Sequence, residues 1–323
     1  MRQPRLRGSF SCAIAAMLTG CLGQGAGATC PESIADCLGE AKNFLFVASD
    51  KLSLGSWKEV TYGYATRYGT MVNGDACGVT ARLQGSSASD YETTISGDLL
   101  ALAGPGKVAV SVHSDFSFYP GEAGVLVYGV LATGGGRVVG QIDAGSSGGI
   151  DTSGTNPKVA SCRQAIADMQ SASTMLANLP ATQELGPVAV RGDTFRIVAG
   201  PGVNVITTPL ISLRSVSSPG YYYRQGGVLE IDTSPDTQSV VINAGKLYVG
   251  IGAEIYGYGD VIINVPGPGP SIKVFTYSGY QQAYINGPPI LAPQRGIKLY
   301  TGITTNFFAR QIGSRGTDVY SYY

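Results

Sequence analysis

Residues 239–265 read SVVINAGKLYVGIGAEIYGYGDVIINV, and this stretch decides the fold class. Short apolar runs at 240–242, 246–249 and 261–265 are separated by glycines, which suit tight turns. The runs are short and rich in β-branched residues, so they predict β-strands rather than helices. Several are continuously apolar instead of alternating, which predicts strands buried on both faces.

The same pattern continues through most of the chain. Glycine accounts for 46 of 323 residues and tyrosine for 19, whereas charged residues make up only 14%. This composition is typical of many short strands joined by tight turns. The further strands that we expect are Phe44–Ala48, Val108–Val112, Val125–Val130, Thr194–Val198, Val203–Thr207, Val228–Ile231 and Ile272–Thr276. The predicted fold class is mainly β.

One segment, about residues 158–179, predicts a long amphipathic helix. It lacks glycine, and an apolar stripe recurs at three- and four-residue steps. The stripe consists of Cys162, Ile166, Met169, Ala172, Leu176 and Leu179. Asn156 suits the N-cap, Pro157 the first turn and Pro180 the end. The helix either marks a boundary between two β halves or packs along one elongated β body.

The N-terminus predicts export from the cytoplasm. Three arginines, a short apolar run and small residues ending at Ala28 form the pattern of a signal peptide, with cleavage after Ala28. A competing interpretation is that Leu18-Thr19-Gly20-Cys21 is a lipobox and that Cys21 carries a lipid anchor. Both routes place the protein outside the cytoplasm.

Four cysteines remain after the predicted cleavage: Cys30, Cys37, Cys77 and Cys162. An even number in an oxidising compartment predicts two disulfides, in any of three pairings. Free buried thiols are the alternative. A zinc site is disfavoured because there is no C-x-x-C pair and His113 is the only histidine. The sequence indicates neither a metal nor another cofactor.

The charge balance limits the partners. Without residues 1–28 the chain carries 19 basic residues (22 − 3) against 22 acidic ones, a net charge near −3. No cluster of Lys and Arg in the sequence indicates a nucleic-acid or anionic-lipid surface. No segment after the signal is long and apolar enough to span a membrane.

Motifs in the C-terminal third and in the helix resemble those of the choice-of-anchor A family of microbial surface proteins. The segments are Val261-Ile262-Ile263-Asn264-Val265, Pro289-Ile290-Leu291-Ala292-Pro293, Gly302-Ile303, Ala309-Arg310, Leu176-Ala177-Asn178-Leu179-Pro180 and Leu38-Gly39-Glu40-Ala41-Lys42-Asn43-Phe44. Residues 51–140 depart from the family pattern. The resemblance implies a β-helix with one helix packed along its side, similar to adhesin-type and ice-binding-type domains, and an adhesive role. The sequence up to Tyr323 contains no sortase motif and no apolar tail, so we expect either a lipid anchor at Cys21 or release of the protein.

Catalytic patterns are weak. His113 would have to serve any Ser–His–Asp or Cys–His site, and no G-x-S-x-G elbow accompanies it. The acidic residues are scattered singly, whereas a glycan-cleaving β-helix needs paired carboxylates. We therefore expect no catalytic residues, and a polysaccharide-active enzyme is the alternative.

Tyr221-Tyr222-Tyr223-Arg224 is the candidate binding segment, because tyrosines stack on sugars and pack in protein interfaces. Inward-packed tyrosines on a strand are the alternative. Ice binding would need a regular threonine array, and threonine pairs such as Thr93-Thr94 are isolated.

The sequence thus predicts a signal peptide at 1–28 and a single β-helix domain at 29–323. It predicts a secreted or lipid-anchored, non-catalytic, adhesin-like protein that binds a glycan, an extracellular protein or itself. Ice binding is a further alternative.

Overall fold

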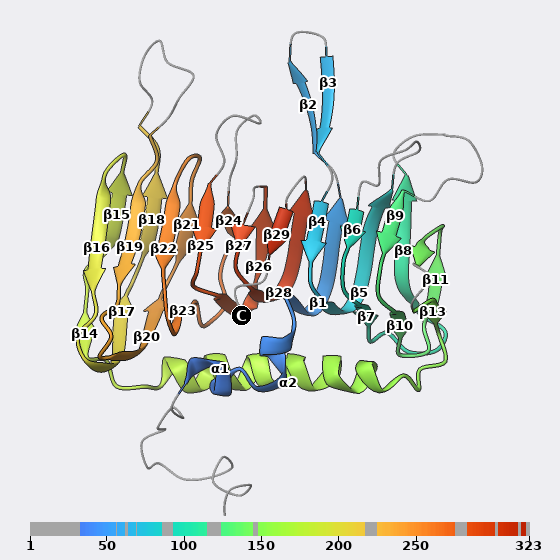
Figure 1. Cartoon of the computed structure of the whole chain (residues 1–323), viewed down its shortest axis with the longest axis horizontal. Helices are drawn as coiled ribbons and strands as arrows, with labels where there is room; N and C mark the ends of the chain where they lie inside the picture. The colour runs from blue at the N-terminus through green and yellow to red at the C-terminus, as the bar shows by residue number, and fades with distance from the viewer. Residues whose placement is uncertain are drawn as a thin grey trace, which may run out of the picture.

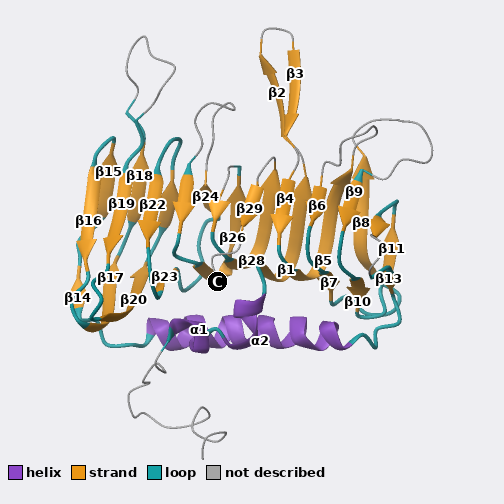
Figure 2. Ribbon diagram, viewed as in Figure 1, coloured by secondary structure: helices purple, strands orange, loops and turns teal. Residues whose placement is uncertain are grey.

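The computed structural model describes residues 33–55, 57–61, 64–68, 70–85, 93–114, 124–144, 148–216, 225–274, 283–300, 303–315 and 318–320. The chain is mainly β, with parallel strands stacked side by side and one long helix beneath them (Figures 1 and 2). Two sheets of 17 and 10 strands account for the stack. This arrangement is consistent with the predicted β-helix.

The strands form three faces, which we call A, B and C. Face A lies against the helix. Its strands are β7 (Leu99–Ala101), β10 (Leu131–Thr133), β13 (Ile150–Asp151), β14 (Gln183–Glu184), β17 (Gly202–Thr208), β20 (Thr237–Ala244), β23 (Val261–Asn264) and the first parts of β1 (Phe46–Gly55), β5 (Ala76–Gly85), β26 (Ile290–Leu299) and β28 (Phe307–Arg315). The register of β1 against both neighbours shifts between Ala48 and Lys51, and the chain turns there from face A to face B.

Face B is made of the second parts of those four long strands and six shorter ones. These are β8 (Val108–Ser114), β11 (Arg137–Val139), β15 (Val188–Arg191), β18 (Ile211–Arg214), β21 (Leu247–Val249) and β24 (Ile272–Val274).

Face C is the separate 10-stranded sheet. It contains β4 (Thr70–Asn73), β6 (Thr93–Ile95), β9 (Val125–Val127), β12 (Asp143–Ala144), β16 (Thr194–Val198), β19 (Val228–Asp232), β22 (Glu254–Gly257), β25 (Tyr284–Asn286), β27 (Ile303–Thr304) and β29 (Asp318–Tyr320). An antiparallel hairpin of β2 (Trp57–Thr61) and β3 (Tyr64–Tyr68) projects between faces B and C (Figure 1).

The chain enters the stack in its middle. Strand β1 pairs with β5 on one side and with β28, from the opposite end of the sequence, on the other. The coils proceed from β1 to β13, the helix α2 (Pro157–Ala177) runs back along the stack, and the coils resume at β14. The two β halves are therefore parts of one 17-stranded sheet, and the helix packs along it.

The core follows from strand alternation. Many strands of faces B and C bury every second residue, as in β15 with Val188 and Val190 inside, whereas β9 and β18 bury three in succession. Face A is buried on both sides in the middle of the stack, where all four residues of β23 are buried, whereas β13 and β14 at its ends are exposed. This explains the continuously apolar runs of the sequence. In each such strand, alternate side chains fill the interior of the stack, and the others pack against α2.

Helix α2 begins as the sequence predicts. Asn156 is the N-cap, its Oδ1 accepting from Lys158 N at 3.0 Å, and Pro157 occupies the first position. Cys162, Met169, Ala172 and Leu176 of the predicted stripe are buried against face A. A disulfide joins Cys77 of β5 to Cys162.

Polar contacts also tie α2 to face A. Asn264 accepts from Ser173 Oγ at 2.7 Å and donates to Ser173 O at 3.1 Å. It also donates to Asn243 Oδ1 at 2.8 Å, and Asn243 donates to Leu176 O at 2.8 Å. These groups are buried, so each depends on its protein partner.

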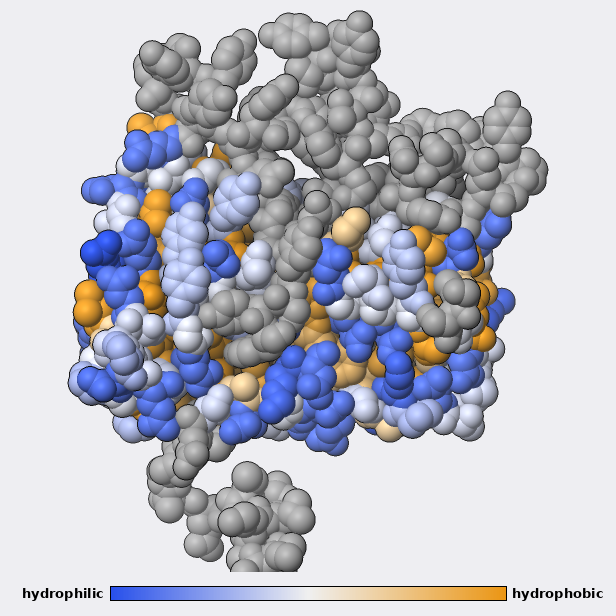
Figure 3. All heavy atoms as spheres, in the orientation of Figure 1, coloured by the Kyte–Doolittle hydropathy of each residue, from blue (hydrophilic) through white to orange (hydrophobic). Residues whose placement is uncertain are grey.

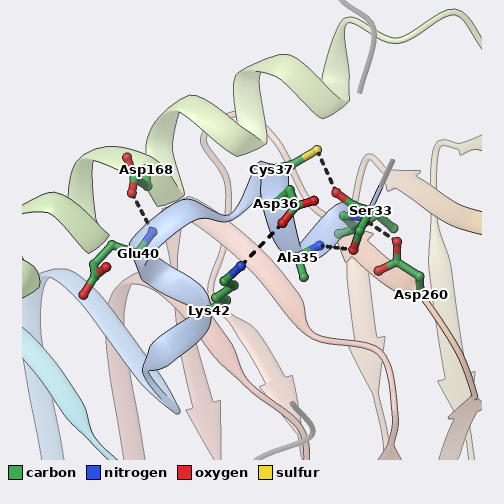
Figure 4. A network of polar contacts seen from close by, with 9 residues as sticks. Ser33, Ala35, Asp36, Cys37, Glu40, Lys42, Asp168 and Asp260 are labelled. Carbon is green, nitrogen blue, oxygen red and sulfur yellow. Dashed lines mark hydrogen bonds and ion pairs between the residues drawn. The ribbon is translucent and has the colours of Figure 1, made fainter. Parts of the chain in front are cut away.

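A short N-terminal segment packs beside α2. It contains helix α1 (Ile34–Cys37), which the sequence analysis missed, and a 3-10 helix (Gly39–Asn43). Glu40 N donates to Asp168 of α2 at 2.7 Å, and Ile34 N donates to Asp260 at 2.6 Å. Figure 4 shows Asp168 and Asp260 beside this N-terminal segment. Burial raises the pKa of Asp260.

All the predicted strands lie on observed ones, with shifted ends. The first begins at Phe46, because Phe44 still caps the 3-10 helix. The predicted helix end at 179 is two residues late, since Asn178 is the C-cap. In the described part of the chain, no helix has the length and apolarity needed to cross a membrane. Cys21, Ala28 and Cys30 lie outside the described residues, and Cys37 Sγ lies 3.7 Å from Ser33 O.

Candidate functional site

The predicted binding segment Tyr221–Arg224 lies outside the described residues, between β18 of face B and β19 of face C. His113 is described: it is exposed on β8, and its register partner on β5 is Gln84. Asp115, its acidic neighbour in sequence, is not described. No catalytic arrangement forms around His113 among the described residues.

The carboxylates nearest to a glycan-cleaving arrangement lie on face C. Arg196 donates from Nη2 and Nε to Glu230 Oε2 at 2.6 and 2.8 Å, and its Nε lies 3.2 Å from Asp232. The Arg196 side chain is 60% exposed, so the group sits on an open strand surface. Both carboxylates contact one guanidinium, and these contacts raise the pKa of Arg196. Their partner is thus a side chain of the same open face.

A second pair of acids has a structural role. Asp75 Oδ1 accepts from Asp98 N at 2.8 Å, and Asp98 Oδ1 accepts from Val130 N at 2.8 Å, so each carboxylate binds the next coil. Lys158, at the start of α2, forms an ion pair with Asp98. Desolvation by burial raises the pKa of Asp75. These side chains connect neighbouring coils to each other and to the helix.

Face C presents tyrosines and acids on its outer side. Tyr256 OH donates to Glu254 at 2.6 Å, and this bond raises the pKa of Tyr256 to about 12. Tyr258 and Tyr284 are 61% and 47% exposed. Figure 3 shows hydrophilic and hydrophobic side chains interspersed over an open strand surface. The described strands of face C contain five acids and one basic residue, Arg196.

Face B has the opposite character. Seven of its strands carry an outward Lys or Arg whose side chain is described. Within the described ranges, its strands contain one acid, Asp50, where β1 turns from face A to face B. The seven are Lys51, Arg82, Arg137, Arg191, Arg214, Lys273 and Lys298, all exposed except the half-buried Lys51. We call this surface the basic face.

The register places several of these residues in rows. Arg191 pairs with Arg214, and Lys273 pairs with Lys298, on directly adjacent parallel strands. Arg214 Cζ lies 5.6 Å from the centre of the Tyr248 ring, and Arg214 Nε donates to Ser212 at 3.2 Å. The ring and the hydroxyl hold this guanidinium flat on the surface.

A hollow of about 420 Å³ opens in the middle of the basic face. Gly296 and Gly313 leave out side chains there, and Lys51, Lys298, Ser53 and Gln311 surround the space. Ser271 and Tyr300 also line it. A carboxylate reaches the lining from the corner with face A, where Asp50 accepts from Gln311 at 2.6 Å.

The sequence analysis missed the basic face because its charges are single in the sequence. The pattern that could have revealed them is a basic residue between two apolar ones, as in Ile272-Lys273-Val274, Ile297-Lys298-Leu299 and Ala81-Arg82-Leu83. Only parallel stacking in register turns these separate triplets into one charged surface.

No family model matches the chain, so the resemblance to the choice-of-anchor A family stays a prediction. No curated protein matches either. Among solved structures, the chain is similar to an ice-binding protein from an Antarctic ascomycete, Antarctomyces psychrotrophicus, with 16% identity over 88% of this chain and 96% of the other and a TM-score of 0.39. It is also similar to the ice-binding protein LeIBP from an Arctic yeast, with 14% identity, coverage of 88% and 94%, and a TM-score of 0.42.

A third similar structure is an ice binding protein from an Antarctic biological consortium, with 11% identity, coverage of 92% and 95%, and a TM-score of 0.32. The similarity spans most of each chain, but the sequence identities and TM-scores are too low to assign a function to this chain.

Proposed function

We propose that this chain is a secreted, non-catalytic β-helix protein that binds an extended extracellular polymer on an open strand face. The observation that carries the proposal is that the faces of the stack differ in what covers them. Helix α2 covers face A, whereas face B presents exposed side chains on successive strands. Neighbouring strands lie about 4.8 Å apart, so an extended chain laid across them meets a new side chain at each step.

The chemistry of the described acids supports a binding role over an enzymatic one. Glu230 and Asp232 are held by Arg196 on an open surface, and Asp75 and Asp98 bind the backbone of neighbouring coils. Glycoside hydrolysis needs one protonated and one ionised carboxyl group flanking a bond in a cleft. The adhesin-like role and export remain parts of this proposal. Export takes one of two routes: a signal peptide cleaved after Ala28, or a lipid anchor at Cys21.

Ice binding is the second candidate, and the regular spacing of the strands on face B favours it. The outward row of face B is unlike a regular threonine array, however. In register order its described part includes Ala189, Ser212, Tyr248, Lys273, Lys298, Gly313, Ser53, Arg82, Ser111 and Val139. Charged side chains bind liquid water strongly and interrupt such a surface.

The test is a glycan and extracellular-matrix array with the purified protein, together with analysis of the same glycans for released products. Saturable binding without cleavage is the expected result. Release of oligosaccharides would overturn the non-catalytic role. Thermal hysteresis in a nanolitre osmometer, with no array binding, would favour the second candidate instead.

A further inference from the structure

Three tyrosines lie close together on the outer side of face C. Tyr256 is on β22, Tyr258 follows the end of that strand, and Tyr284 is on the adjacent parallel strand β25. Tyr258 and Tyr284 are exposed, and both raise the pKa of Tyr256 electrostatically, which places the three phenol groups near one another. We call Tyr256, Tyr258 and Tyr284 the tyrosine cluster.

A row of polar side chains crosses the same surface. Its members are register partners on five successive parallel strands, from β16 to β27, and therefore lie on one side of the sheet. They are Arg196, Glu230, Tyr256, Asn286 and Thr304. Five strands span about 19 Å at about 4.8 Å per step, so the row is longer than a single sugar ring. We call it the polar row.

Polar contacts within face C hold part of this surface in place. Tyr256 OH donates to Glu254 at 2.6 Å, and Arg196 contacts Glu230 and Asp232 at 2.6 and 3.2 Å. Side chains that are fixed before binding lose less conformational freedom when a ligand arrives. These side chains therefore form a surface that is prepared for a ligand.

We propose that the tyrosine cluster and the polar row bind a neutral polysaccharide, which lies across the strands from β16 to β27; this rests on the polymer-binding role proposed above. A sugar ring has faces of C–H groups and an edge of hydroxyl groups. The faces pack on exposed aromatic rings such as those of Tyr258 and Tyr284, because these rings are apolar with a polar tip. Each sugar hydroxyl both donates and accepts, so it can bind a carboxylate such as Glu230 and the amide of Asn286.

The charge of face C favours a neutral ligand. Its described strands contain five acids and one basic residue, Arg196, and a surface of this sign repels acidic polysaccharides and nucleic acids. A neutral sugar is not repelled, and its hydroxyl groups form stronger hydrogen bonds with carboxylates than with neutral acceptors. The excess of acids thus disfavours anionic polymers without weakening the contact with neutral ones.

A polysaccharide fits this surface better than a protein does. The buried centres of protein interfaces are enriched in tyrosine but depleted in Asp and Glu. Here Glu254 and Glu230 lie beside Tyr256. Two copies of the chain that met through face C would also bring acids against acids. Sugar hydroxyls, in contrast, can replace the water that is bound to these carboxylates.

The experiment measures binding of the purified protein to polysaccharides by affinity gel electrophoresis. The neutral probes are laminarin, xyloglucan, galactomannan and dextran, and the anionic probe is polygalacturonate. We expect saturable binding to at least one neutral polymer, and this binding should not weaken with salt, because no counterions are released. The test variant Tyr258→Ala/Tyr284→Ala should bind at least about tenfold more weakly, whereas Tyr258→Phe/Tyr284→Phe, which keeps the rings, should stay within about threefold of the parent.

Tyr128→Ala is the matched control. Tyr128 is 54% exposed, against 61% for Tyr258 and 47% for Tyr284, and it follows β9, six strands from β22 in the same sheet. That separation is about 29 Å at about 4.8 Å per strand, beyond the end of the polar row. Tyr128→Ala should therefore bind like the parent, which distinguishes the tyrosine cluster from a general effect of removing surface tyrosines.

Each other outcome decides a different point. Binding to neutral polymers that the alanine double variant leaves unchanged, or that Tyr128→Ala weakens equally, would refute this site and leave the polymer-binding role standing. Preference for polygalacturonate over every neutral polymer would refute the neutral ligand, and binding to extracellular-matrix proteins alone would refute the polysaccharide. No binding to any of these polymers would refute the site and the polymer-binding role together.

Thermal unfolding checks the fold of each variant. If the alanine double variant unfolds at a lower temperature than the parent, Tyr258→Ala alone replaces it, because Tyr258 is exposed and lies beyond the end of β22. Parent-like binding by a folded Tyr258→Ala, or a tenfold loss in Tyr258→Phe/Tyr284→Phe, would refute stacking on these rings.

Discussion

Replacing Asn264 with leucine tests how the helix is held to the sheet. Asn264 is fully buried and makes three hydrogen bonds, two to Ser173 and one to Asn243. Leucine has the same branched skeleton of heavy atoms, is larger, and makes none of these bonds. The Ser173 hydroxyl and Asn243 Oδ1 then lose a buried partner, at about 1–3 kcal/mol each. The apolar gain of leucine, about 1.5–3 kcal/mol, offsets part of this loss.

We therefore expect Asn264→Leu to lower the free energy of unfolding by about 2–3 kcal/mol, measured by urea denaturation followed by circular dichroism. Adding Ser173→Ala removes one orphaned group, so the two substitutions should couple by about 1 kcal/mol or more in a double-mutant cycle. Thr174→Ala is the control, since Thr174 is exposed and its hydroxyl donates to Gln170 O within the helix. A loss below about 0.5 kcal/mol for Asn264→Leu, or no coupling, would refute this account of the helix attachment.

Three further predictions concern stability. Cys77→Ala/Cys162→Ala removes a cross-link between residues 85 positions apart and should lower the free energy of unfolding by about 4–5 kcal/mol in the same urea assay. An unchanged urea midpoint would show that the disulfide does not contribute to stability. Asp260→Asn should raise the melting temperature at pH 7. Burial raises the pKa of Asp260 above its ordinary 3.8 in the folded protein, so the charged carboxylate is disfavoured there. The difference in melting temperature between the variant and the parent should disappear as the pH falls towards 3.8. Gly287→Ala should lower the free energy of unfolding by about 3 kcal/mol or more, because the φ of Gly287 is +118° and a Cβ would lie 1.7 Å from Gly257 O. Gly267 has a φ of +79° and open space around it, so Gly267→Ala should lower it by only about 1 kcal/mol. Equal losses in the two variants would contradict the steric argument.

Local patterns predicted the secondary structure well. Strand β23 and helix α2 could be placed because apolar runs, caps and prolines act within a few residues. The cysteine count named Cys77 and Cys162 among the bonded candidates but could not choose their pairing. Helix α1 was missed because four residues are too few for a periodic signal.

The arrangement of the coils could not be read from the sequence, because it depends on contacts between distant residues. Phe46 pairs with Phe307 in the sheet, and their rings lie 6.1 Å apart in the core. The basic face has the same origin: Lys298 of β26 joins the face of Lys51 and Arg82 only when β28 pairs with β1. Lys and Arg therefore form no run in the sequence, although the fold concentrates seven of them on one face.

The position of β1 between β28 and β5 also sets the order in which the molecule can be completed. Until β28 has been synthesised, β1 has one neighbour, and its other edge presents unpaired backbone groups. The contact between Asn306 and Phe44 joins residues 262 positions apart, and such long-range closure makes folding slow. A chain that emerges from a ribosome or a translocation channel from its N-terminus must therefore keep an adhesive edge protected until nearly all of it has emerged. We therefore expect the pairing of β1 with β28 to be among the last steps of folding.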